Sequence, residues 1–252
     1  MRPRFPDKAK EINVCGWQAV QALFEQHPAE IKRLFFDAAT GKRVGKLCSY
    51  LAQNRKVYRQ LPREELERAA GTVHHGGIVA VIAERPLRRV TRETIDGWAI
   101  ARMPLLILDR VGNANNLGAI VRTAAFFGVK AIVVPEHPSQ ALPGDAAWRV
   151  AEGGMEFVDF YRVPTLGEFC ATLKRVYFLV GSSLSGGPLS EVTHSAGSPP
   201  AALILGNEEH GMSPEVSAAC DALVKISGVQ AVQSLNVSAA AAVLCWELFG
   251  KY

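Results

Sequence analysis

The side chains best suited to chemistry gather in the second half of the chain, between Leu203 and Trp246. An apolar run leads into Gly206 and stops at the acidic, glycine-containing loop 207–211, as a buried parallel strand does where it ends at a ligand site. A second short strand is predicted over 223–226. It is followed by Ser234-Leu235-Asn236, where Ser or Asn opens an alanine-rich helix. Two strand ends and one helix start are therefore predicted to converge on one ligand site.

A third block lies upstream, at the start of a helix predicted from Asn116 to Phe127. It reads Asn116-x-Gly118-x-x-x-Arg122. Gly118 lies four residues before Arg122, on the same helical face, and removes a side chain from the space over which the guanidinium must reach. Together with the blocks GNEEHG and SLNVSAA, it resembles in order and approximate spacing the three signature motifs of the SpoU (TrmH) family of RNA ribose 2′-O-methyltransferases. The likeness covers nearly the whole chain.

This resemblance implies an α/β fold in two parts. A small α/β substrate-binding domain precedes a SPOUT-type parallel-sheet domain, in which the C-terminal segment threads back as a trefoil knot. In the family the knotted loops hold S-adenosyl-L-methionine, no metal is needed and the enzymes work as homodimers. Methyl transfer from a sulfonium to a ribose hydroxyl requires an in-line approach. Because holding the reactants in that geometry can remove roughly 7 to 11 kcal/mol of barrier, the motifs are interpreted first as positioning groups.

The resemblance also carries over to individual residues. The catalytic candidates are Asn116, Arg122, Glu208, Ser234 and Asn236, and the cofactor-binding candidates are Gly206, Ile226 and Leu235. In the family the arginine lies beside the target ribose and is proposed to help deprotonate the 2′-hydroxyl. A guanidinium holds its proton so firmly that gripping a phosphate or orienting the ribose is physically easier, so both roles stay open for Arg122. Glu208 can orient Arg122 or Asn116 through a charge-assisted hydrogen bond.

Three positions depart from the family's pattern. This chain has Asn113-Ala114 where the family often has Asp-Pro, and Ile226-Ser227 where it often has Ile-Pro. Gln230 replaces a glycine that usually follows. None of these changes removes a proposed catalytic side chain. They place the chain on an outlying branch, so its RNA substrate is not inferred from the best-known members.

Length and composition indicate a globular protein that stays in the cytoplasm. The chain has 252 residues, of which 48% are hydrophobic, enough for one large domain or two smaller ones. No run approaches the roughly 20 apolar residues of a membrane span, and the start has no apolar signal region. The five cysteines contain no C-x-x-C pair, which indicates reduced thiols rather than a disulfide framework or a zinc site.

Charge divides the chain into two unlike halves. Residues 1–103 hold 19 of the 28 Lys and Arg but 11 of the 24 Asp and Glu, a net charge of +8. Residues 104–252 have a net charge of −4. A basic first half can collect a polyanion while the second half performs chemistry. A merely solvated basic surface explains the charge equally well.

The first half is predicted to be a small alternating α/β unit. Helices are expected after Gly16, over 45–54 and over 63–70, and strands over 31–37, 56–61 and 78–82. His74 and His75 precede the last strand and are interpreted as part of a turn, because no third metal ligand is near in sequence. The predicted organisation is an arm at 1–11, an RNA substrate-binding domain at 12–84, a linker at 85–103 and the methyltransferase domain at 104–252. The linker arginines Arg85, Arg88, Arg89 and Arg92 can pair with RNA phosphates or simply form a solvated hinge.

From residue 104 the pattern is a repeating βα wind. Strands are predicted over 105–109, 130–136, 157–163 and 176–184, and helices over 116–127, 146–152 and 165–175, with loops at 137–145 and 185–200. This order favours an open parallel sheet covered on both faces. A Rossmann dinucleotide-binding fold is disfavoured because no G-x-G-x-x-G follows the first strand.

Two functional classes are weighed against each other. The first is an S-adenosylmethionine-dependent RNA 2′-O-methyltransferase acting on ribosomal or transfer RNA. The second is a non-catalytic RNA-binding protein that retains the fold. Retention of the polar side chains in all three motifs favours the enzyme.

Overall fold

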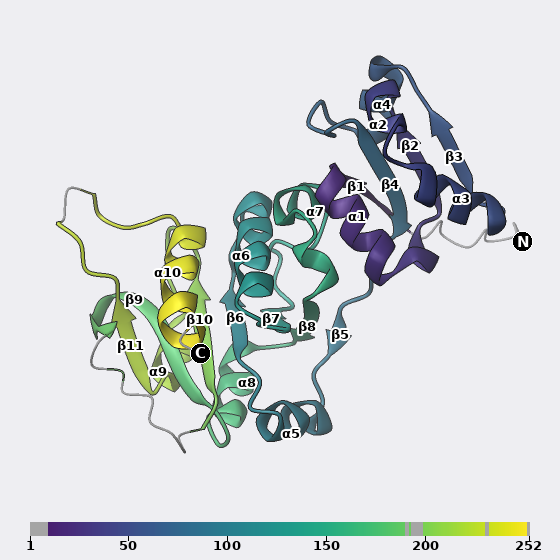
Figure 1. Cartoon of the computed structure of the whole chain (residues 1–252). Coiled ribbons are helices and arrows are strands. Elements are labelled where there is room, and N and C mark those ends of the chain that lie inside the picture. Colours follow the sequence, from purple (N-terminus) through teal and green to yellow (C-terminus); the bar gives the residue numbers. More distant parts are fainter. Residues whose placement is uncertain (1–9, 190–191, 193–198, 230–231, 251–252) are drawn as a thin grey trace, which may run out of the picture. The chain divides into compact units, whose positions relative to one another are not determined.

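The computed structural model describes residues 10–189, 192, 199–229 and 232–250. It divides into two compact units (Figure 1). The first unit comprises Met1–Pro86 and Gly144–Glu156, and the second comprises Leu87–Pro143 and Phe157–Tyr252.

The first unit is built on a four-stranded sheet with the order β1-β4-β2-β3, in which only β2 and β3 run parallel. Its strands are β1 (Glu11–Cys15), β2 (Arg33–Phe36), β3 (Val57–Gln60) and β4 (Ile78–Ala83). The central strand β4 is a continuous apolar run because both of its faces are covered. The helices are α1 (Trp17–Gln26), α2 (Ala38–Gly41), α3 (Gly45–Gln53), α4 (Arg63–Ala70) and α7 (Asp145–Ala151), with short 3₁₀ turns η1 (Pro28–Glu30) and η2 (Gly154–Glu156).

Most elements predicted for this unit are confirmed, but strand β1 and the short helix α2 were not predicted. Helix α4 has the predicted bounds because Pro62 precedes it and Gly71, with φ of 68°, ends it in a left-handed conformation. The turn at His74–Gly77 is also confirmed, since His75 Nδ1 accepts a hydrogen bond from Gly77 N at 3.1 Å. Strand β1 was not predicted as a strand. Residues 1–9 of the predicted arm lie outside the described residues, and Glu11 already belongs to β1.

A segment from the middle of the sequence completes the first unit. Helix α7 packs on β1, and Asp145 Oδ1 accepts a hydrogen bond from Asn13 N at 3.1 Å. The buried carboxylate of Glu156 lies 2.7 Å from Arg85 and 2.6 Å from His27. Residues 144–156 therefore fold with the first unit, although the sequence placed them in the methyltransferase domain at 104–252. Contacts with residues distant in sequence, not position along the chain, determine to which unit residues 144–156 belong.

The second unit contains a seven-stranded sheet in which every pair is parallel, with the order β11-β9-β10-β6-β7-β8-β5. Its strands are β5 (Arg88–Arg89), β6 (Leu105–Asp109), β7 (Ala131–Pro135), β8 (Asp159–Val163), β9 (Phe178–Pro188), β10 (Ala201–Gly206) and β11 (Ala222–Lys225). Strands β6, β7 and β10 read as unbroken apolar runs and are buried along their length, as the central strands of a covered parallel sheet must be.

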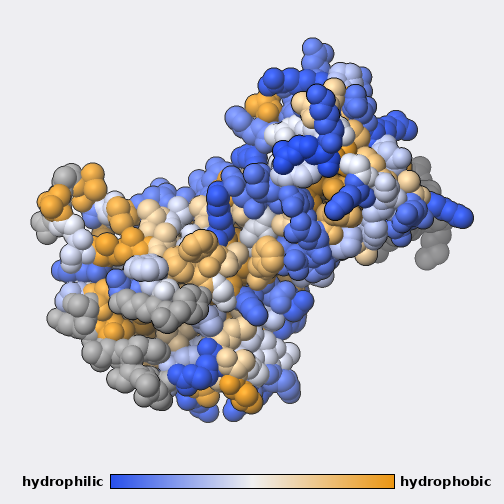
Figure 2. Space-filling model, in the orientation of Figure 1, coloured by the Kyte–Doolittle hydropathy of each residue, from blue (hydrophilic) through white to orange (hydrophobic). Residues whose placement is uncertain are grey.

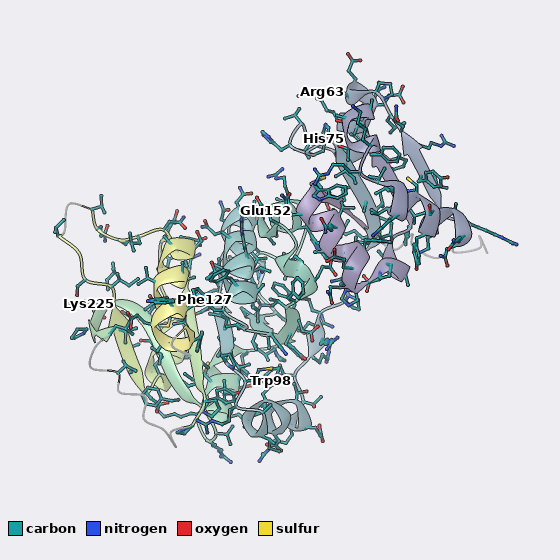
Figure 3. All side chains as sticks on the ribbon, viewed as in Figure 1. Arg63, His75, Trp98, Phe127, Glu152 and Lys225 are labelled. Carbon is teal, nitrogen blue, oxygen red and sulfur yellow. The ribbon has the colours of Figure 1, made fainter. Side chains whose placement is uncertain are left out.

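Helices cover both faces of this sheet. The helices of the second unit are α5 (Arg92–Ile100), α6 (Ala114–Phe126), α8 (Leu166–Leu173), α9 (Pro214–Ala219) and α10 (Val237–Phe249). One face packs against α5, α8 and α9. On this face Trp98 of α5, labelled in Figure 3, enters the core. Its ring meets that of Tyr161 edge-on at a centroid distance of 4.8 Å. Alternate strand residues such as Leu106 and Leu203 point to the opposite face and are fully buried, and α10 packs there on β10 and α6. The predicted parallel sheet covered on both faces is confirmed.

Three local predictions for this part of the chain differ from the structure. Much of the predicted linker 85–103 is folded, because Ile95 and Trp98 of α5 enter the core and the β5 residues pair with β8. Strand β9 continues to Pro188, beyond the predicted start of a loop at residue 185. Helix α9 was not predicted. Among the described residues, no helix is both long and apolar enough to cross a membrane.

Candidate functional site

The loop between β6 and α6 begins the site. Asn113 is the N-cap of α6, and its side-chain oxygen accepts hydrogen bonds from the backbone N–H groups of Asn115 and Asn116 at 2.8 and 3.1 Å. Asparagine is among the best residues for this position because its oxygen satisfies N–H groups that the helix leaves open. The departure at Asn113-Ala114 therefore keeps a well-capped helix that presents Asn116 in its first turn.

The loop after β10 folds back on its own strand. Asn207 forms an isolated β-bridge with Gly211, and its side-chain oxygen accepts from the N–H groups of Glu209 and His210 at 3.0 and 3.1 Å. A Cβ on Gly206 would lie 2.3 Å from both Gly211 C and Met212 N. Only glycine fits there, because the returning backbone of the same loop occupies the space.

A chain of side-chain hydrogen bonds joins the three sequence motifs. Asn116 Nδ2 donates to Glu208 Oε1 at 2.7 Å, and Asn116 Oδ1 accepts from Asn236 Nδ2 at 3.0 Å. Asn236 Oδ1 in turn accepts from the N–H and hydroxyl groups of Ser238 at 2.8 and 2.7 Å. Glu208 Oε2 also accepts from Gly112 N at 3.2 Å. The amide of Asn116 is thus held with its donor on the carboxylate, and the amide of Asn236 with its donor on Asn116 Oδ1.

Helices α6 and α10 lie side by side and run parallel, although they are far apart in sequence. Their first turns meet through Asn116 and Asn236, and their last turns meet through the rings of Phe127 and Trp246, whose centroids are 6.3 Å apart. Asn236 is the N-cap of α10, so the predicted start of the alanine-rich helix is confirmed. Two positive helix ends therefore meet beside Glu208.

The pKa of Glu208 reflects these contacts. Partial burial raises it, but hydrogen bonds from Asn116 and from backbone N–H groups, including those of Gly112 and Asn113, favour the charged form and hold the pKa below the ordinary value of 4.5. Glu208 is therefore a carboxylate at neutral pH. It can accept hydrogen bonds and orient donors, but it does not supply a proton.

A second set of contacts ties the two loops together and was not predicted from the sequence. The buried carboxylate of Asp109, at the end of β6, accepts from Arg110 Nε at 2.9 Å and from Ser213 N at 2.5 Å. Asn207 Nδ2 donates to the backbone oxygen of Arg110 at 2.8 Å. Arg110 has a φ of 62°, a left-handed conformation that is costly for a residue other than glycine. The sequence feature that could have pointed to this tether is Asn207, the asparagine of the GNEEHG block.

The side chains of the remaining candidates are exposed or half-buried. Arg122 is exposed, six residues after Asn116 on α6. Ser234 and Leu235 are exposed in the segment just before α10, and Ile226 is half-buried directly after β11. The structure thus joins Asn116, Glu208 and Asn236 directly, and of the two predicted partners of Glu208 it shows a hydrogen bond from Asn116. Gln230 lies outside the described residues.

Comparison with protein families identifies the chain. Residues 103–246 match the model of the SpoU rRNA Methylase family. The chain belongs to this family. Residues 13–87 match a second model, that of the RNA 2′-O ribose methyltransferase substrate-binding domain.

Relatives along the whole chain agree with this assignment. The protein YfiF of Escherichia coli O157:H7, named as an uncharacterized tRNA/rRNA methyltransferase, is 34% identical over 249 residues, which cover 95% of this chain and 68% of that protein. The 23S rRNA (guanosine-2′-O-)-methyltransferase RlmB of Acinetobacter baylyi is 31% identical over 246 residues, covering 95% and 97%. RlmB of Bordetella pertussis is 34% identical over 241 residues, covering 93% and 95%.

Solved structures share the fold. An AdoMet-bound rRNA methyltransferase from Sinorhizobium meliloti superposes with a TM-score of 0.74 at 19% identity, covering 96% of this chain and 88% of that one. The SpoU methyltransferase AviRb from Streptomyces viridochromogenes, in complex with AdoMet, gives 0.71 at 22% identity, covering 95% and 89%. The predicted α/β fold of a SpoU methyltransferase with an added N-terminal domain is confirmed, while the trefoil knot stays a prediction.

Proposed function

We propose that this protein is an S-adenosylmethionine-dependent methyltransferase that modifies a ribose 2′-hydroxyl in RNA. The observation that carries the proposal is the hydrogen-bonded chain from Asn236 through Asn116 to Glu208, which brings the three family motifs together. Membership in the SpoU family and the names of the relatives give the reaction class. The RNA is ribosomal or transfer RNA.

The segments around this chain fit the cofactor. Val229, Val232 and Leu235 are 96%, 72% and 48% exposed, and Figure 2 shows apolar atoms over the stretch between β11 and α10. Three exposed apolar side chains so close in sequence form a surface that a flat adenine ring can cover. Gly206, Ile226 and Leu235 would hold the cofactor, which supplies a methyl group on a sulfonium.

The protein's own residues then position the ribose. Glu208 fixes the amide of Asn116, and Asn116 with Asn236 forms a rigid polar edge at the start of two helices. Arg122, further along α6, grips a phosphate or orients the 2′-hydroxyl, and Ser234 contributes a hydroxyl from the adjoining segment. A positioned acid, base or orienting group typically changes a rate by about 10²- to 10⁴-fold.

The first unit supplies RNA affinity. Its match to a substrate-binding model supports this part of the proposal, and so does its net charge of +4, from 16 Lys and Arg against 12 Asp and Glu over residues 1–86 and 144–156. Of the four linker arginines that were predicted to pair with RNA phosphates or form a solvated hinge, three form ion pairs within the protein. Arg85 pairs with Glu156, Arg88 with Asp159 and Arg92 with Asp96. Phosphate contacts are therefore assigned to other basic side chains of the unit, such as Lys42, Lys46 and Arg59, which are exposed.

The protein works as a homodimer through α6 and α10. Phe126, Trp246 and Val243 are 81%, 54% and 39% exposed on these two packed helices, and such a cluster is typical of a self-association surface. Light scattering after gel filtration should give twice the mass of the 252-residue chain, and Phe126→Asp should shift it toward the monomer.

The decisive experiment measures transfer of a labelled methyl group to RNA from cells that lack the gene. Ribosomal and transfer RNA fractions are tested separately, and the modified nucleotide is mapped by its resistance to alkaline cleavage. Incorporation at a ribose supports the proposal. If the protein binds both cofactor and RNA but transfers nothing to either fraction, it is the non-catalytic RNA-binding module instead.

A further inference from the structure

A glutamine in the loop between β7 and α7 reaches the loop that begins the site. Gln140 is only 5% exposed, although glutamine is mostly a surface residue. Its side-chain Nε2 donates to Val111 O at 3.2 Å and to Ala141 O at 3.0 Å. Ala141 N also donates to Val111 O, at 2.9 Å. Both lone pairs of this one backbone oxygen are therefore used by the loop after β7.

The loop after β7 is held by its own hydrogen bonds. Gln140 N donates to His137 O at 3.0 Å, and Ser139 N donates to His137 Nδ1 at 3.1 Å. A Cβ on Gly112 would lie 3.2 Å from Ser139 O, so this loop and the loop before α6 are in close contact. A closed turn thus carries the Gln140 side chain toward the loop before α6.

The oxygen that Gln140 binds belongs to the same peptide group as Gly112 N. A peptide group is planar, and in the trans form found here its C=O and N–H bonds point in opposite directions. On one side, Val111 O accepts the two hydrogen bonds from the loop after β7. On the other side, Gly112 N donates to Glu208 Oε2 at 3.2 Å. The groups that hold Val111 O therefore also set the direction of the N–H bond that reaches Glu208.

Half of the Gln140 amide gains nothing from this arrangement. Its Oε1 is buried, and none of the residues that the structure describes donates a hydrogen bond to it. A buried acceptor without a donor is destabilising, so an apolar side chain of similar length would suit the fold at least as well. Stability therefore does not require an amide at this position, whereas holding the peptide group that reaches Glu208 does.

We propose that Gln140 is a positioning residue for methyl transfer, which orients Glu208 through the peptide group that joins residues 111 and 112. Two donors on one oxygen fix the tilt of the peptide plane, whereas a single donor lets the plane turn about that hydrogen bond. Glu208 holds the Asn116 amide with its other oxygen, so a tilted Gly112 N–H would let the carboxylate and the amide shift together. The inference rests on the proposed function in so far as Asn116 and Glu208 serve methyl transfer.

Gln140→Met tests this role in the full-length protein. Methionine is unbranched and of similar length but has no donor, and Val111 O keeps its hydrogen bond from Ala141 N. The kcat for methyl transfer to RNA should fall about 10- to 10²-fold, with the KM for RNA and for the cofactor nearly unchanged, because the reacting groups are misplaced while both substrates still bind. Urea unfolding should give a stability equal to that of the wild type or higher, because the unsatisfied Oε1 is removed.

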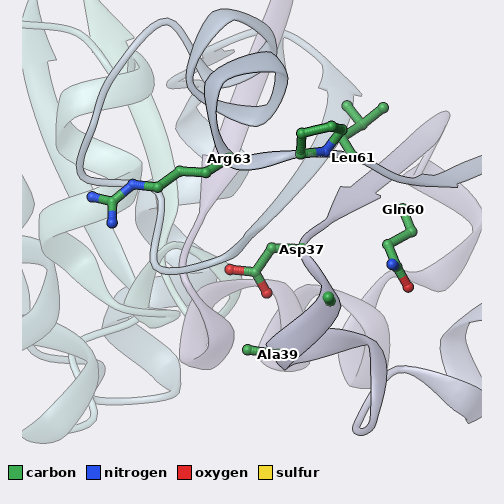
Figure 4. Close-up of a pocket in the computed structure, with 7 residues that line it drawn as sticks. Asp37, Ala39, Gln60, Leu61 and Arg63 are labelled. Atoms are coloured by element: carbon green, nitrogen blue, oxygen red, sulfur yellow. The ribbon is translucent and has the colours of Figure 1, made fainter.

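The Gly112 amide provides a measurement that does not depend on catalysis. Its hydrogen exchange, followed by NMR, should be about tenfold faster in Gln140→Met, because the N–H bond to Glu208 opens more often. Gln60→Met is the matched control, with the same replacement of an amide by a thioether. Gln60 is exposed in the first unit, where it lines an open pocket at the ends of β2 and β3 (Figure 4). This control should leave kcat and Gly112 exchange unchanged.

A wild-type kcat in Gln140→Met would overturn the proposal. A loss of kcat matched by a loss of stability or by a raised KM would also overturn it, because that pattern indicates a purely structural role. A wild type that transfers no methyl group refutes the proposed function instead. Gly112 exchange then still decides whether Gln140 orients the peptide group: faster exchange in Gln140→Met keeps the orienting role, and unchanged exchange removes it.

Discussion

Asn116 and Glu208 come from different strand ends, and their side chains meet at 2.7 Å. The carboxylate also accepts from Gly112 N, so it connects the loop after β10 to the loop before α6. Because Asn116 binds Asn236 with its other amide atom, the contact with Glu208 determines which atom faces which partner. The Glu208 carboxylate therefore sets the orientation of the Asn116 amide on α6 and, through it, that of the Asn236 amide at the start of α10.

Glu208→Gln should disturb this orientation. Glutamine offers one acceptor where the carboxylate offers two, and its NH₂ group would face either Asn116 Nδ2 or Gly112 N. Turnover should fall by about 10²-fold, as expected for a small misplacement of positioning groups. Methyl transfer at saturating RNA and cofactor measures it, and wild-type turnover in the variant would show that the contact has no positioning role.

The same variant should reveal a pH dependence of stability. The pKa of Glu208 is lowered in the folded protein, so its stabilising contribution is complete above the ordinary value of 4.5. It is lost as pH falls through the lowered value. The difference in unfolding free energy between the wild type and Glu208→Gln should therefore be constant near neutrality and shrink below the ordinary value of 4.5. Urea unfolding across that range measures it, and a difference independent of pH would contradict the assignment.

Gly206→Ala should damage the loop itself. The new Cβ would lie 2.3 Å from Gly211 C and Met212 N, so the returning backbone must move. We expect a loss of about 1 to 3 kcal/mol in unfolding free energy together with weaker cofactor binding. Gly97→Ala on α5 is the matched control, because a Cβ there meets nothing within 4 Å and Gly97 lies outside the proposed cofactor segments. Calorimetry and thermal unfolding of both variants check this, and equal behaviour of the two would remove Gly206 from the site.

The sequence anticipated the elements whose signals are local. Helix α4 follows from Pro62 and Gly71 at its ends, and β6 from an unbroken apolar run. Strand β1 was missed because only its alternate residues Ile12 and Val14 signal a strand, over a very short length. Helix α5 was hidden in an arginine-rich stretch, since only its packed partners show that Trp98 is a core residue.

Other features depend on contacts that no local pattern contains. Strand β9 continues through Ser185, Gly186 and Gly187 because β11 lies so close that a Cβ on Gly186 would be 2.6 Å from the Leu223 backbone. In the site, the contact of Glu208 with Asn116 was one of two predicted alternatives. The direct bond from Asn236 to Asn116 and the tether at Asn207 are long-range contacts, and the motif spacing did not reveal them.

Arg85→Ala should destabilise the first unit strongly. The carboxylate of Glu156 is fully buried, and Arg85 pairs with it at 2.7 Å while also binding Glu30 and lying over the Trp148 ring. Removing Arg85 leaves the buried carboxylate with His27 as its remaining side-chain partner, and breaking a buried ion pair typically costs about 3 to 5 kcal/mol. Arg88→Ala removes an exposed pair and should cost about 0 to 1 kcal/mol. Equal unfolding free energies for the two variants would refute the structural role of Arg85.

Asn207→Asp should loosen the tether between the two loops. The carboxylate keeps the acceptors for the N–H groups of Glu209 and His210 but replaces the donor to Arg110 O with a repelling oxygen. We expect about 1 to 3 kcal/mol less stability and a parallel loss of turnover. Glu209→Ala is the control, because its side chain is 85% exposed. If Asn207→Asp behaved like this control in both urea unfolding and methyl transfer, the hydrogen bond from the Asn207 amide to Arg110 O would not be needed to hold the Arg110 backbone.

Arg122→Ala should abolish most of the turnover while leaving cofactor affinity nearly unchanged. Asn116 hydrogen-bonds to Glu208 in the loop after β10, and Arg122→Ala leaves this contact in place, so the proposed cofactor segments should keep their arrangement. Loss of a positioned acid, base or orienting group typically costs about 10²- to 10⁴-fold in rate. Calorimetry with the cofactor and labelled methyl transfer to RNA measure the two effects separately. Parallel losses in both would show that Arg122 supports the cofactor site instead.

Arg122→Lys decides which role the guanidinium has. Lysine keeps the positive charge but lacks the planar fork with its paired donors, so simple attraction to a phosphate should survive the change while a shaped contact to the ribose or phosphate should not. Substantial turnover in the lysine variant, with a raised KM for RNA and a nearly unchanged kcat, would assign Arg122 to phosphate gripping. A kcat as low as that of Arg122→Ala, with the KM for RNA close to that of the wild type, would place the guanidinium at the reacting hydroxyl, because only a group acting in the transition state lowers kcat without weakening binding.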